Sequence, residues 1–274
     1  MEVILAEYLG FCYGVKRAIQ LARSSAESGP VSTLGPIIHN PQMVARLVEE
    51  GVGTVDTVEE MPVGGTIIIR SHGVGPKVYD EARARSLTIV DATCPHVKKA
   101  QMSAHQLAEG GRSVVIVGEK KHPEVKSIFE WANETAVVVE TEAEAEALMP
   151  QAKLGVVAQT TFSGERFRRI VDRLLEKSSD IHIVRTICTA TDQRQAAALE
   201  LAERVDLMLV IGGKNSANTT RLAQLCSEKA ATHHIETASE LRDEWFRGIQ
   251  KIGITAGAST PDWIIREVYK RCQM

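Results

Sequence analysis

Short apolar runs alternate with amphipathic helical patterns along the whole chain. The runs at 3–9, 87–90 and 181–187 are rich in β-branched and apolar residues and predict buried strands. Helical patterns follow them, for example at about 15–25 and 191–204. Strands that alternate with helices are typical of parallel sheets with right-handed crossovers. The pattern therefore predicts an α/β protein.

Proline and glycine mark the expected helix boundaries. Proline suits the first position of a helix, and glycine commonly follows the last one. The sequence places Pro41, Pro76, Pro123 and Pro261 at expected helix starts and Gly29, Gly51 and Gly110 after expected helix ends. The acidic stretch at 142–148 is interpreted as a short solvated helix.

The pattern repeats three times, with a cysteine as the origin of each copy. Cys12, Cys94 and Cys188 each end a predicted strand and precede a predicted helix. The first two are separated by 82 positions and the last two by 94. Each copy then places a glycine four residues before a polar group, and later a strand that runs into a polar turn. The polar groups after glycine are His39, His122 and Ser216, and the later turns lie at 70–72, 159–161 and 257–259.

The repeat predicts three similar α/β domains with parallel sheets in a pseudo-threefold arrangement. Their expected limits are 13–94, 95–188, and 189–274 together with 1–12. The third copy lacks its last strand, so the N-terminal strand at 3–9 is expected to complete its sheet. We therefore expect the chain to close on itself there.

Composition excludes several classes of function. The chain has 274 residues, 44% hydrophobic and 24% charged, with a net charge of −3 and no run of lysine or arginine, which disfavours nucleic acid as a partner. No apolar run reaches the ~18 residues of a membrane span, and the chain begins directly with a strand, so a cytoplasmic protein is expected. Neither a phosphate-binding loop with its lysine nor a complete dinucleotide fingerprint is present, so bound NAD is not expected.

Five cysteines without a C-x-x-C pair favour a metal or a nucleophile over a disulfide framework. Cys226 and Cys272 lie on helical patterns and are interpreted as small hydrophobic residues. Cys12, Cys94 and Cys188 would converge if the carboxyl ends of the three sheets face a common centre. They could then be buried structural residues, a three-cysteine zinc site or ligands of an iron–sulfur cluster. Matched positions disfavour the first, and structural zinc normally takes four ligands.

Polar residues at the expected helix starts predict an anion site, because the backbone N–H groups there favour negative charge. These residues are His39, His72, His122, Ser216, Asn218 and Ser259. Few lysines accompany them, so neutral or imidazolium donors and backbone amides would bind a diphosphate. Glu124 is an acid in one of these turns and is interpreted either as a proton donor or as a residue that complements the helix dipole.

The motifs together resemble the 4-hydroxy-3-methylbut-2-enyl diphosphate reductase family over the whole chain. The matching motifs are Gly-Phe-Cys-Tyr-Gly-Val-Lys at 10–16, Ile-His-Asn-Pro at 38–41, Ser-His-Gly-Val at 71–74, Asp-Ala-Thr-Cys-Pro at 91–95, His-Pro-Glu at 122–124, Gln-Thr-Thr at 159–161, Ile-Cys at 187–188, Lys-Asn-Ser-Ala-Asn at 214–218 and Gly-Ala-Ser at 257–259. Two positions depart from the family pattern, Arg70-Ser71 before the His-Gly pair and Ala217 in place of a second serine.

The resemblance implies three α/β domains around a central [4Fe–4S] cluster that is held by Cys12, Cys94 and Cys188 and leaves one iron open. It implies a catalytic set of Glu124, Thr160 and His122. It implies a diphosphate site formed by His39, His72, His122, Ser216, Asn218 and Ser259, with Thr160 on the substrate hydroxyl. The departure at Ala217 implies one hydrogen bond fewer to the diphosphate.

The implied reaction is reductive dehydroxylation of an allylic diphosphate to isopentenyl and dimethylallyl diphosphate. Electrons would come singly from ferredoxin or flavodoxin. Two alternatives stay open at this stage. One is a non-redox iron–sulfur hydro-lyase, and the other is an iron–sulfur sensor with a phosphorylated ligand.

Overall fold

The computed structural model describes residues 1–273 and contains three four-stranded sheets of parallel strands. The chain divides into two compact units. The first unit comprises Met1–Lys16, Ile38–Arg46 and Thr189–Met274, and the second comprises Arg17–Ile37 and Leu47–Cys188. Helices α1 (Tyr13–Ala26) and α2 (Pro41–Glu49) have residues in both units.

The first unit is built on one sheet. Its strand order is β1 (Glu2–Leu5), β12 (Lys251–Ala256), β10 (Leu207–Ile211), β11 (Ala231–Ile235). The N-terminal strand β1 pairs with β12, Val3 opposite Ile252, which confirms the expected closure of the chain. Its other helices are α8 (Thr189–Ala202), α9 (Ala217–Ser227) and α10 (Asp262–Cys272), with the short 3-10 turns η3 (Ala238–Glu240) and η4 (Asp243–Phe246).

The second unit contains two sheets. One has the order β3 (Val52–Val55), β2 (Val31–Leu34), β4 (Thr66–Ile69), β5 (Thr88–Asp91), and the other has the order β7 (Val137–Val139), β6 (Ser113–Val117), β8 (Leu154–Ala158), β9 (Ile181–Ile183). Its helices are α3 (Pro76–Ala84), α4 (Pro95–Glu109), α5 (Pro123–Trp131), α6 (Glu142–Glu146) and α7 (Gly164–Leu174), with the 3-10 turns η1 (Val58–Glu60) and η2 (Leu175–Lys177).

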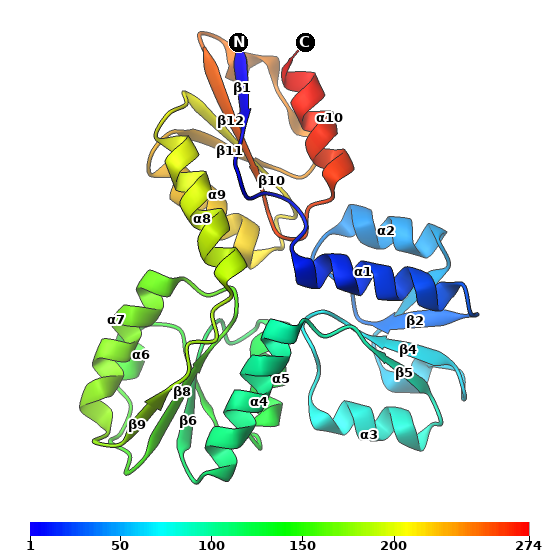
Figure 1. The fold of residues 1–274 in the computed structure, drawn as a ribbon, viewed down its shortest axis with the longest axis vertical. Helices are drawn as coiled ribbons and strands as arrows, with labels where there is room; N and C mark the ends of the chain where they lie inside the picture. Colours follow the sequence, from blue (N-terminus) through cyan, green and yellow to red (C-terminus); the bar gives the residue numbers. More distant parts are fainter. Residues whose placement is uncertain (274) are drawn as a thin grey trace. The chain divides into compact units, whose positions relative to one another are not determined.

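The sheet that contains β6 and β8 is buried between helices. Helices α4 and α5 cover one face of the sheet that contains β6 and β8, and α6 and α7 cover the other (Figure 1). Alternate residues of β6 point to opposite faces, so Val114 and Ile116 pack with α4 and α5, while Val115 and Val117 pack with α6 and α7. This burial of both faces explains why the strands read as continuous apolar runs in the sequence.

The predicted alternation of helices and strands is confirmed in all three copies, but two strands are shorter than expected. Strand β1 ends at Leu5 rather than at 9, and β9 ends at Ile183 rather than at 187. After β9, the Thr186 hydroxyl hydrogen-bonds to both backbone groups of Ala158, so a side chain replaces the sheet ladder there. Helix α10 begins at Asp262, one residue later than predicted. The domain limits 13–94, 95–188, and 189–274 together with 1–12 stay predictions.

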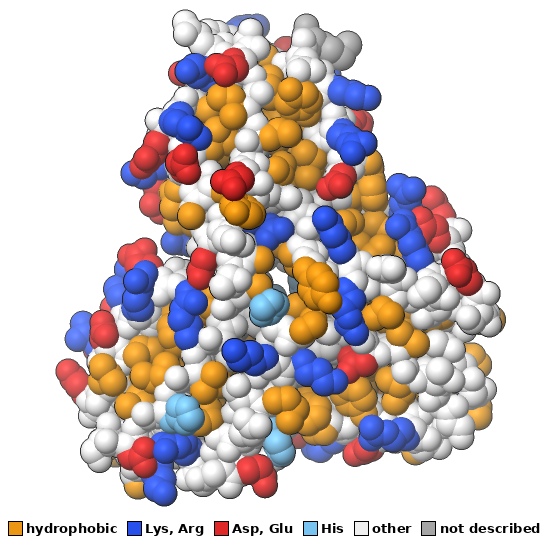
Figure 2. All heavy atoms as spheres, in the orientation of Figure 1, with side chains coloured by type: hydrophobic (Ala, Val, Ile, Leu, Met, Phe, Trp, Pro, Cys, Tyr) orange, Lys and Arg blue, Asp and Glu red, His pale blue; other side chains and the backbone are white. Residues whose placement is uncertain are grey.

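Acidic and basic side chains are interspersed over the face that Figure 2 shows, without a continuous basic area. Within residues 1–273, no helix combines the length and hydropathy that a membrane span needs.

Candidate active site

The three repeat cysteines occupy equivalent turns at the carboxyl ends of the three sheets. Cys94 is the N-cap residue of α4, and Cys12 and Cys188 directly precede α1 and α8. The backbone N–H of each cysteine donates a hydrogen bond to a turn that follows the neighbouring strand. The acceptors are the carbonyls of Ala258 for Cys12 at 3.0 Å, Ser71 for Cys94 at 3.0 Å and Thr160 for Cys188 at 2.8 Å. The repeat in the sequence is therefore also a repeat of backbone hydrogen bonds.

The chemistry of these thiols suits a soft metal. Cys12, Cys94 and Cys188 are half-buried, whereas Cys226 and Cys272 are buried in hydrophobic cores. Burial raises the pKa of both Cys226 and Cys272 to about 11, which keeps those two thiols protonated and unsuitable as metal ligands. The donor set that remains fits an iron–sulfur cluster.

The predicted convergence of the three sulfur atoms stays a prediction. Cys12 belongs to the first unit, and Cys94 and Cys188 belong to the second. Within residues 1–273, no group of three or more His, Cys, Asp or Glu side chains is arranged to hold a metal ion.

Glu124 and Thr160 form a buried acid–hydroxyl pair. Glu124 lies in the first turn of α5 and is only 2% exposed. The Thr160 backbone N–H donates to Glu124 Oε1 at 2.6 Å, and the Thr160 hydroxyl donates to Oε2 at 2.9 Å. Burial raises the pKa of Glu124 to about 7, because the loss of hydration outweighs the two hydrogen bonds that favour the charged form. A carboxyl group with this pKa can both hold and release a proton near neutral pH.

His122 and His72 lie close to this pair in the second unit. His122 is the N-cap residue of α5, and its Nδ1 accepts a hydrogen bond from the Glu124 backbone N–H at 3.2 Å. A neutral His122 ring therefore carries its proton on Nε2, where it can donate to a ligand. The His72 ring meets it edge to face, with centroids 5.6 Å apart. The structure thus brings together His72, His122, Glu124 and Thr160, four of the residues that the sequence predicted.

Two buried polar residues that the sequence analysis missed connect these turns. The Ser127 hydroxyl lies 2.8 Å from the Glu124 carbonyl and 3.1 Å from the His72 carbonyl, and it accepts a hydrogen bond from Gln101 Nε2 at 3.0 Å. Gln101 and Ser127 are 1% and 2% exposed. The sequence signal was available, because Gln101 interrupts the apolar stripe of α4 formed by 97, 100, 104 and 107.

We expect Gly73→Ala to destabilise the fold more than Gly111→Ala. Both glycines have a φ of 70°, so both substitutions carry the same backbone strain. A Cβ at Gly73 would clash with Gln101 Nε2, whereas nothing lies within 4 Å of a Cβ at Gly111. Moving Gln101 would break its bond to Ser127, so the extra cost should be about 2 kcal/mol. Denaturant unfolding of both variants measures the difference in stability. Equal losses of unfolding free energy would contradict the idea that a side chain at 73 displaces Gln101.

Glu124 should also make folding stability depend on pH. Its pKa is raised from 4.5 to about 7 in the folded chain, so the native state holds this proton more tightly than the unfolded chain does. This tighter proton binding stabilises the folded chain fully below about pH 4.5, and the stabilisation is lost as pH rises through 7. In total it amounts to roughly 3 kcal/mol. Unfolding free energies of the wild type and Glu124→Gln at pH 5 and pH 8 measure it. A difference between the two proteins that does not change with pH would contradict the raised pKa.

The first unit contains the other predicted anion-binding residues. Ser216 is the N-cap residue of α9, and no acidic residue lies in the first turn of that helix. Asn218 is 8% exposed, and neither polar atom of its side chain has a hydrogen-bond partner within the described chain. The Ser259 hydroxyl donates to the His39 carbonyl at 3.1 Å. A buried amide without partners costs about 1–3 kcal/mol, so Asn218 is suited to a ligand that supplies them.

The fold and the site define a three-sheet α/β protein with one cysteine at the carboxyl end of each sheet. A buried acid, Glu124, lies between Cys94 and Cys188 in the sequence. The family model described as LytB protein matches residues 3–273, and the chain belongs to this family.

Curated relatives and solved structures agree over the full length. Proteins named 4-hydroxy-3-methylbut-2-enyl diphosphate reductase are 52% identical in Citrifermentans bemidjiense, over 99% of this chain and 96% of the relative, and 50% identical in Geobacter sulfurreducens, over 100% and 97%. A solved structure of (E)-4-hydroxy-3-methyl-but-2-enyl diphosphate reductase, the terminal enzyme of the non-mevalonate pathway, is 46% identical, covers 100% of this chain and 99% of its own, and has a TM-score of 0.76. The reductase of Plasmodium falciparum is 28% identical, covers 99% and 87%, and has a TM-score of 0.93.

Proposed function

We propose that this protein reduces 4-hydroxy-3-methylbut-2-enyl diphosphate to isopentenyl and dimethylallyl diphosphate. The buried Glu124–Thr160 pair carries the proposal, in a chain that is similar to the named reductases from end to end. The reaction breaks the allylic C–O bond and consumes two electrons and two protons. One proton leaves with the hydroxyl group as water, and the other is added to carbon, at either end of the allyl unit.

Cys12, Cys94 and Cys188 would hold a [4Fe–4S] cluster. Their half-buried thiols at matched turns and the exclusion of Cys226 and Cys272 by burial support this assignment. When bound, such a cluster with three cysteine ligands supplies electrons and one open iron for the substrate hydroxyl.

The diphosphate would bind to the polar residues predicted from the sequence. These are His39, His72, His122, Ser216, Asn218 and Ser259. The neutral tautomer of His122 offers Nε2–H, and the unpaired Asn218 amide offers an N–H. Both groups can bind an anion without the help of a lysine. This suits turns that contain few basic residues.

Glu124 would supply a proton through the Thr160 hydroxyl. When Glu124 is protonated, its acidic proton can be donated to Thr160 Oγ1, which is 2.9 Å away. The hydroxyl is then free to donate its own hydrogen to the substrate oxygen. Thr160 would hold and orient the substrate hydroxyl, and Glu124 would restore the proton, in keeping with its pKa of about 7.

The electron donor would be ferredoxin or flavodoxin, because each delivers one electron at a time and the sequence contains no complete dinucleotide fingerprint. The cytoplasmic location expected from the sequence stays a prediction.

The test of the activity is an anaerobic preparation with iron and sulfide counts and a turnover assay. The assay uses the allylic diphosphate and reduced methyl viologen. We expect two electrons consumed for each molecule of product, and isopentenyl and dimethylallyl diphosphate as products. Product without electron consumption would indicate the hydro-lyase, and a cluster without turnover would indicate a sensor. Either outcome would overturn the proposal.

Asn218→Ala should weaken substrate binding more than it slows the chemical step. The substitution removes an amide that we assign to the diphosphate, which is distant from the breaking C–O bond. We expect KM to rise about tenfold, the effect of one hydrogen bond to a charged group, and kcat to change little. Gln224→Ala on the exposed side of α9 is the control. A loss confined to kcat would place Asn218 in a different role.

A further inference from the structure

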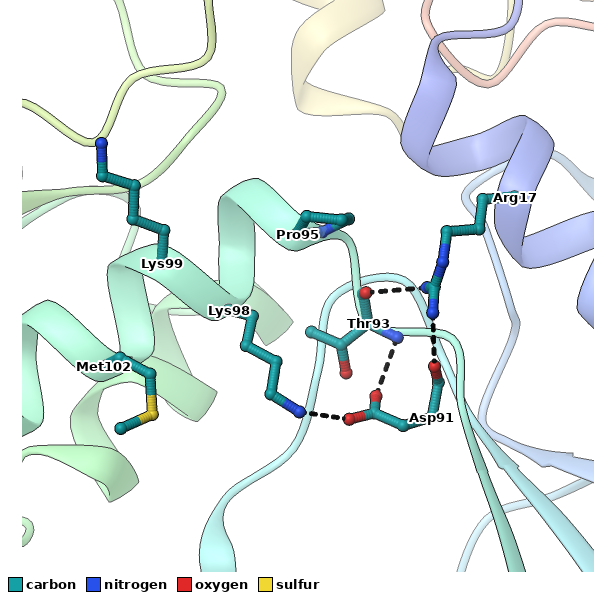
Figure 3. A pocket seen from close by; sticks show the side chains of 7 residues that line it. All are labelled: Arg17, Asp91, Thr93, Pro95, Lys98, Lys99 and Met102. Carbon is teal, nitrogen blue, oxygen red and sulfur yellow. Dashed lines mark hydrogen bonds and ion pairs between the residues drawn. The ribbon is translucent and has the colours of Figure 1, made fainter.

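A hollow in the second unit lies beside Cys94 and has no role in the mechanism described above. Its volume is about 580 Å³, and its wall includes Arg17, Thr93, Pro95, Lys98, Lys99 and Met102 (Figure 3). Thr93 and Pro95 are the chain neighbours of Cys94, the N-cap residue of α4. The hollow therefore opens next to a proposed ligand of the cluster.

The hollow carries an excess of positive charge. Of its three cationic side chains, Lys98 is paired with Asp91 at 2.6 Å. The Arg17 guanidinium donates to two carbonyls, those of Thr93 and Asp91, each at 3.2 Å, so its charge is not neutralised by these contacts. Lys99 is exposed and extends away from the Asp91 carboxylate in Figure 3. Two of the three positive charges thus remain without an acidic partner in the wall.

The position of these lysines on α4 strengthens the positive potential. The N-terminus of a helix carries a partial positive charge that acidic residues in the first turn commonly offset. The first turn of α4 has no acidic residue, and Lys98 and Lys99 are the fourth and fifth residues of the helix. Positive charge near a helix N-terminus destabilises the helix, so helix stability does not explain these two lysines.

The rest of the wall is apolar. Pro95 is exposed and Met102 is half-buried, which leaves an apolar centre next to the cations. Small apolar contacts beside complementary charge are typical of weak, transient protein encounters. A small-molecule pocket would instead enclose its ligand with convergent polar groups.

We propose that this hollow is the docking site of an acidic one-electron carrier protein, with Arg17 and Lys99 facing carboxylates of the carrier. The inference rests on the proposed function, because only a reductase needs such a carrier. The carrier would bind twice in each turnover and give up one electron each time. Its binding would weaken as salt increases, since solvent-exposed charges are screened.

The test compares Lys99→Glu with Lys153→Glu in the cluster-containing enzyme. Lys153 is exposed and precedes β8, so it lies at the amino end of a sheet, whereas the candidate active site lies at the carboxyl end. Both variants change the net charge equally. Binding of ferredoxin is measured by calorimetry at low and high salt, and turnover is measured with reduced ferredoxin and with reduced methyl viologen.

We expect Lys99→Glu to raise the Kd for ferredoxin about fivefold to tenfold at low salt, with a smaller effect at high salt. Ferredoxin-dependent kcat/KM should fall by the same factor, and Lys99→Gln should give an intermediate loss. Turnover with methyl viologen should be unchanged, because a small dye needs no docking surface. Lys153→Glu should behave as the wild type in every measurement.

Three outcomes would overturn the proposal. The first is a Kd for ferredoxin that Lys99→Glu leaves unchanged, and the second is an equal loss of ferredoxin affinity in Lys99→Glu and Lys153→Glu. The third is that inorganic pyrophosphate displaces ferredoxin from the wild type but not from Lys99→Glu. The last would indicate a small-anion site. If the wild type shows no turnover with reduced methyl viologen, the proposed reductase activity is wrong. The calorimetric comparison would then still decide whether ferredoxin binds at this hollow.

Discussion

Replacing Glu124 with glutamine is expected to lower kcat by about 10²- to 10⁴-fold, the usual contribution of a positioned acid or base. Glutamine has nearly the same shape and can still accept a hydrogen bond from the Thr160 backbone N–H, which now lies 2.6 Å from Glu124 Oε1. It has no acidic proton to pass to the Thr160 hydroxyl. Iron content, sulfide content and substrate affinity should therefore stay close to those of the wild type.

The control for this loss is Glu119→Gln. Glu119 lies in the turn that precedes α5, and burial raises its pKa, but its backbone makes its hydrogen bonds: the N–H donates to Gln159 Oε1 and the carbonyl accepts from the His122 N–H. Steady-state kinetics should show Glu119→Gln close to the wild type and Glu124→Gln nearly inactive. Thr160→Ser keeps the hydroxyl and should retain much more activity than Thr160→Val. Near-normal turnover of Glu124→Gln would remove Glu124 from the proton path.

Alanine at Cys12, Cys94 or Cys188 is expected to reduce bound iron, visible absorption and turnover to background levels. Each substitution leaves the proposed cluster with two protein ligands, and thiolates are the ligands that hold such clusters. The backbone N–H of each cysteine still bonds to its turn, so the fold itself should persist. Iron analysis and a visible spectrum under anaerobic conditions measure the loss, and circular dichroism checks the fold.

Cys226→Ala and Cys272→Ala are the matched controls. Both residues are buried in hydrophobic cores, with exposures of 0% and 2%, and both thiols are protonated near neutral pH. These variants should lose about 1 kcal/mol of stability from a small cavity and keep their iron. Full iron content in any of the three variants at Cys12, Cys94 and Cys188 would exclude that cysteine as a ligand.

The sequence by itself determined the elements, their order and the three equivalent turns. These features depend on local periodicity and on a repeat along the chain, and both can be read without coordinates. The N-terminal strand was assigned to the sheet of β12 because the third copy of the repeat lacked a strand, and the pairing of Val3 with Ile252 confirms it. Strand ends were less well predicted, since the Thr186 side chain replaces the ladder after Ile183.

Only the tertiary structure decided the chemical state of the site residues. Glu124 could be a proton donor or a residue that complements a helix dipole, because a sequence does not give hydration. Its pKa of about 7 comes from burial by residues distant in the chain, and its partner Thr160 is 36 residues away. The hydrogen bond between Gln101 and Ser127, 26 residues apart, was missed for the same reason, although Gln101 itself was visible as a polar residue in the apolar stripe of α4. Hydrogen bonds and desolvation between distant segments are set by packing, and local sequence pattern carries no record of them.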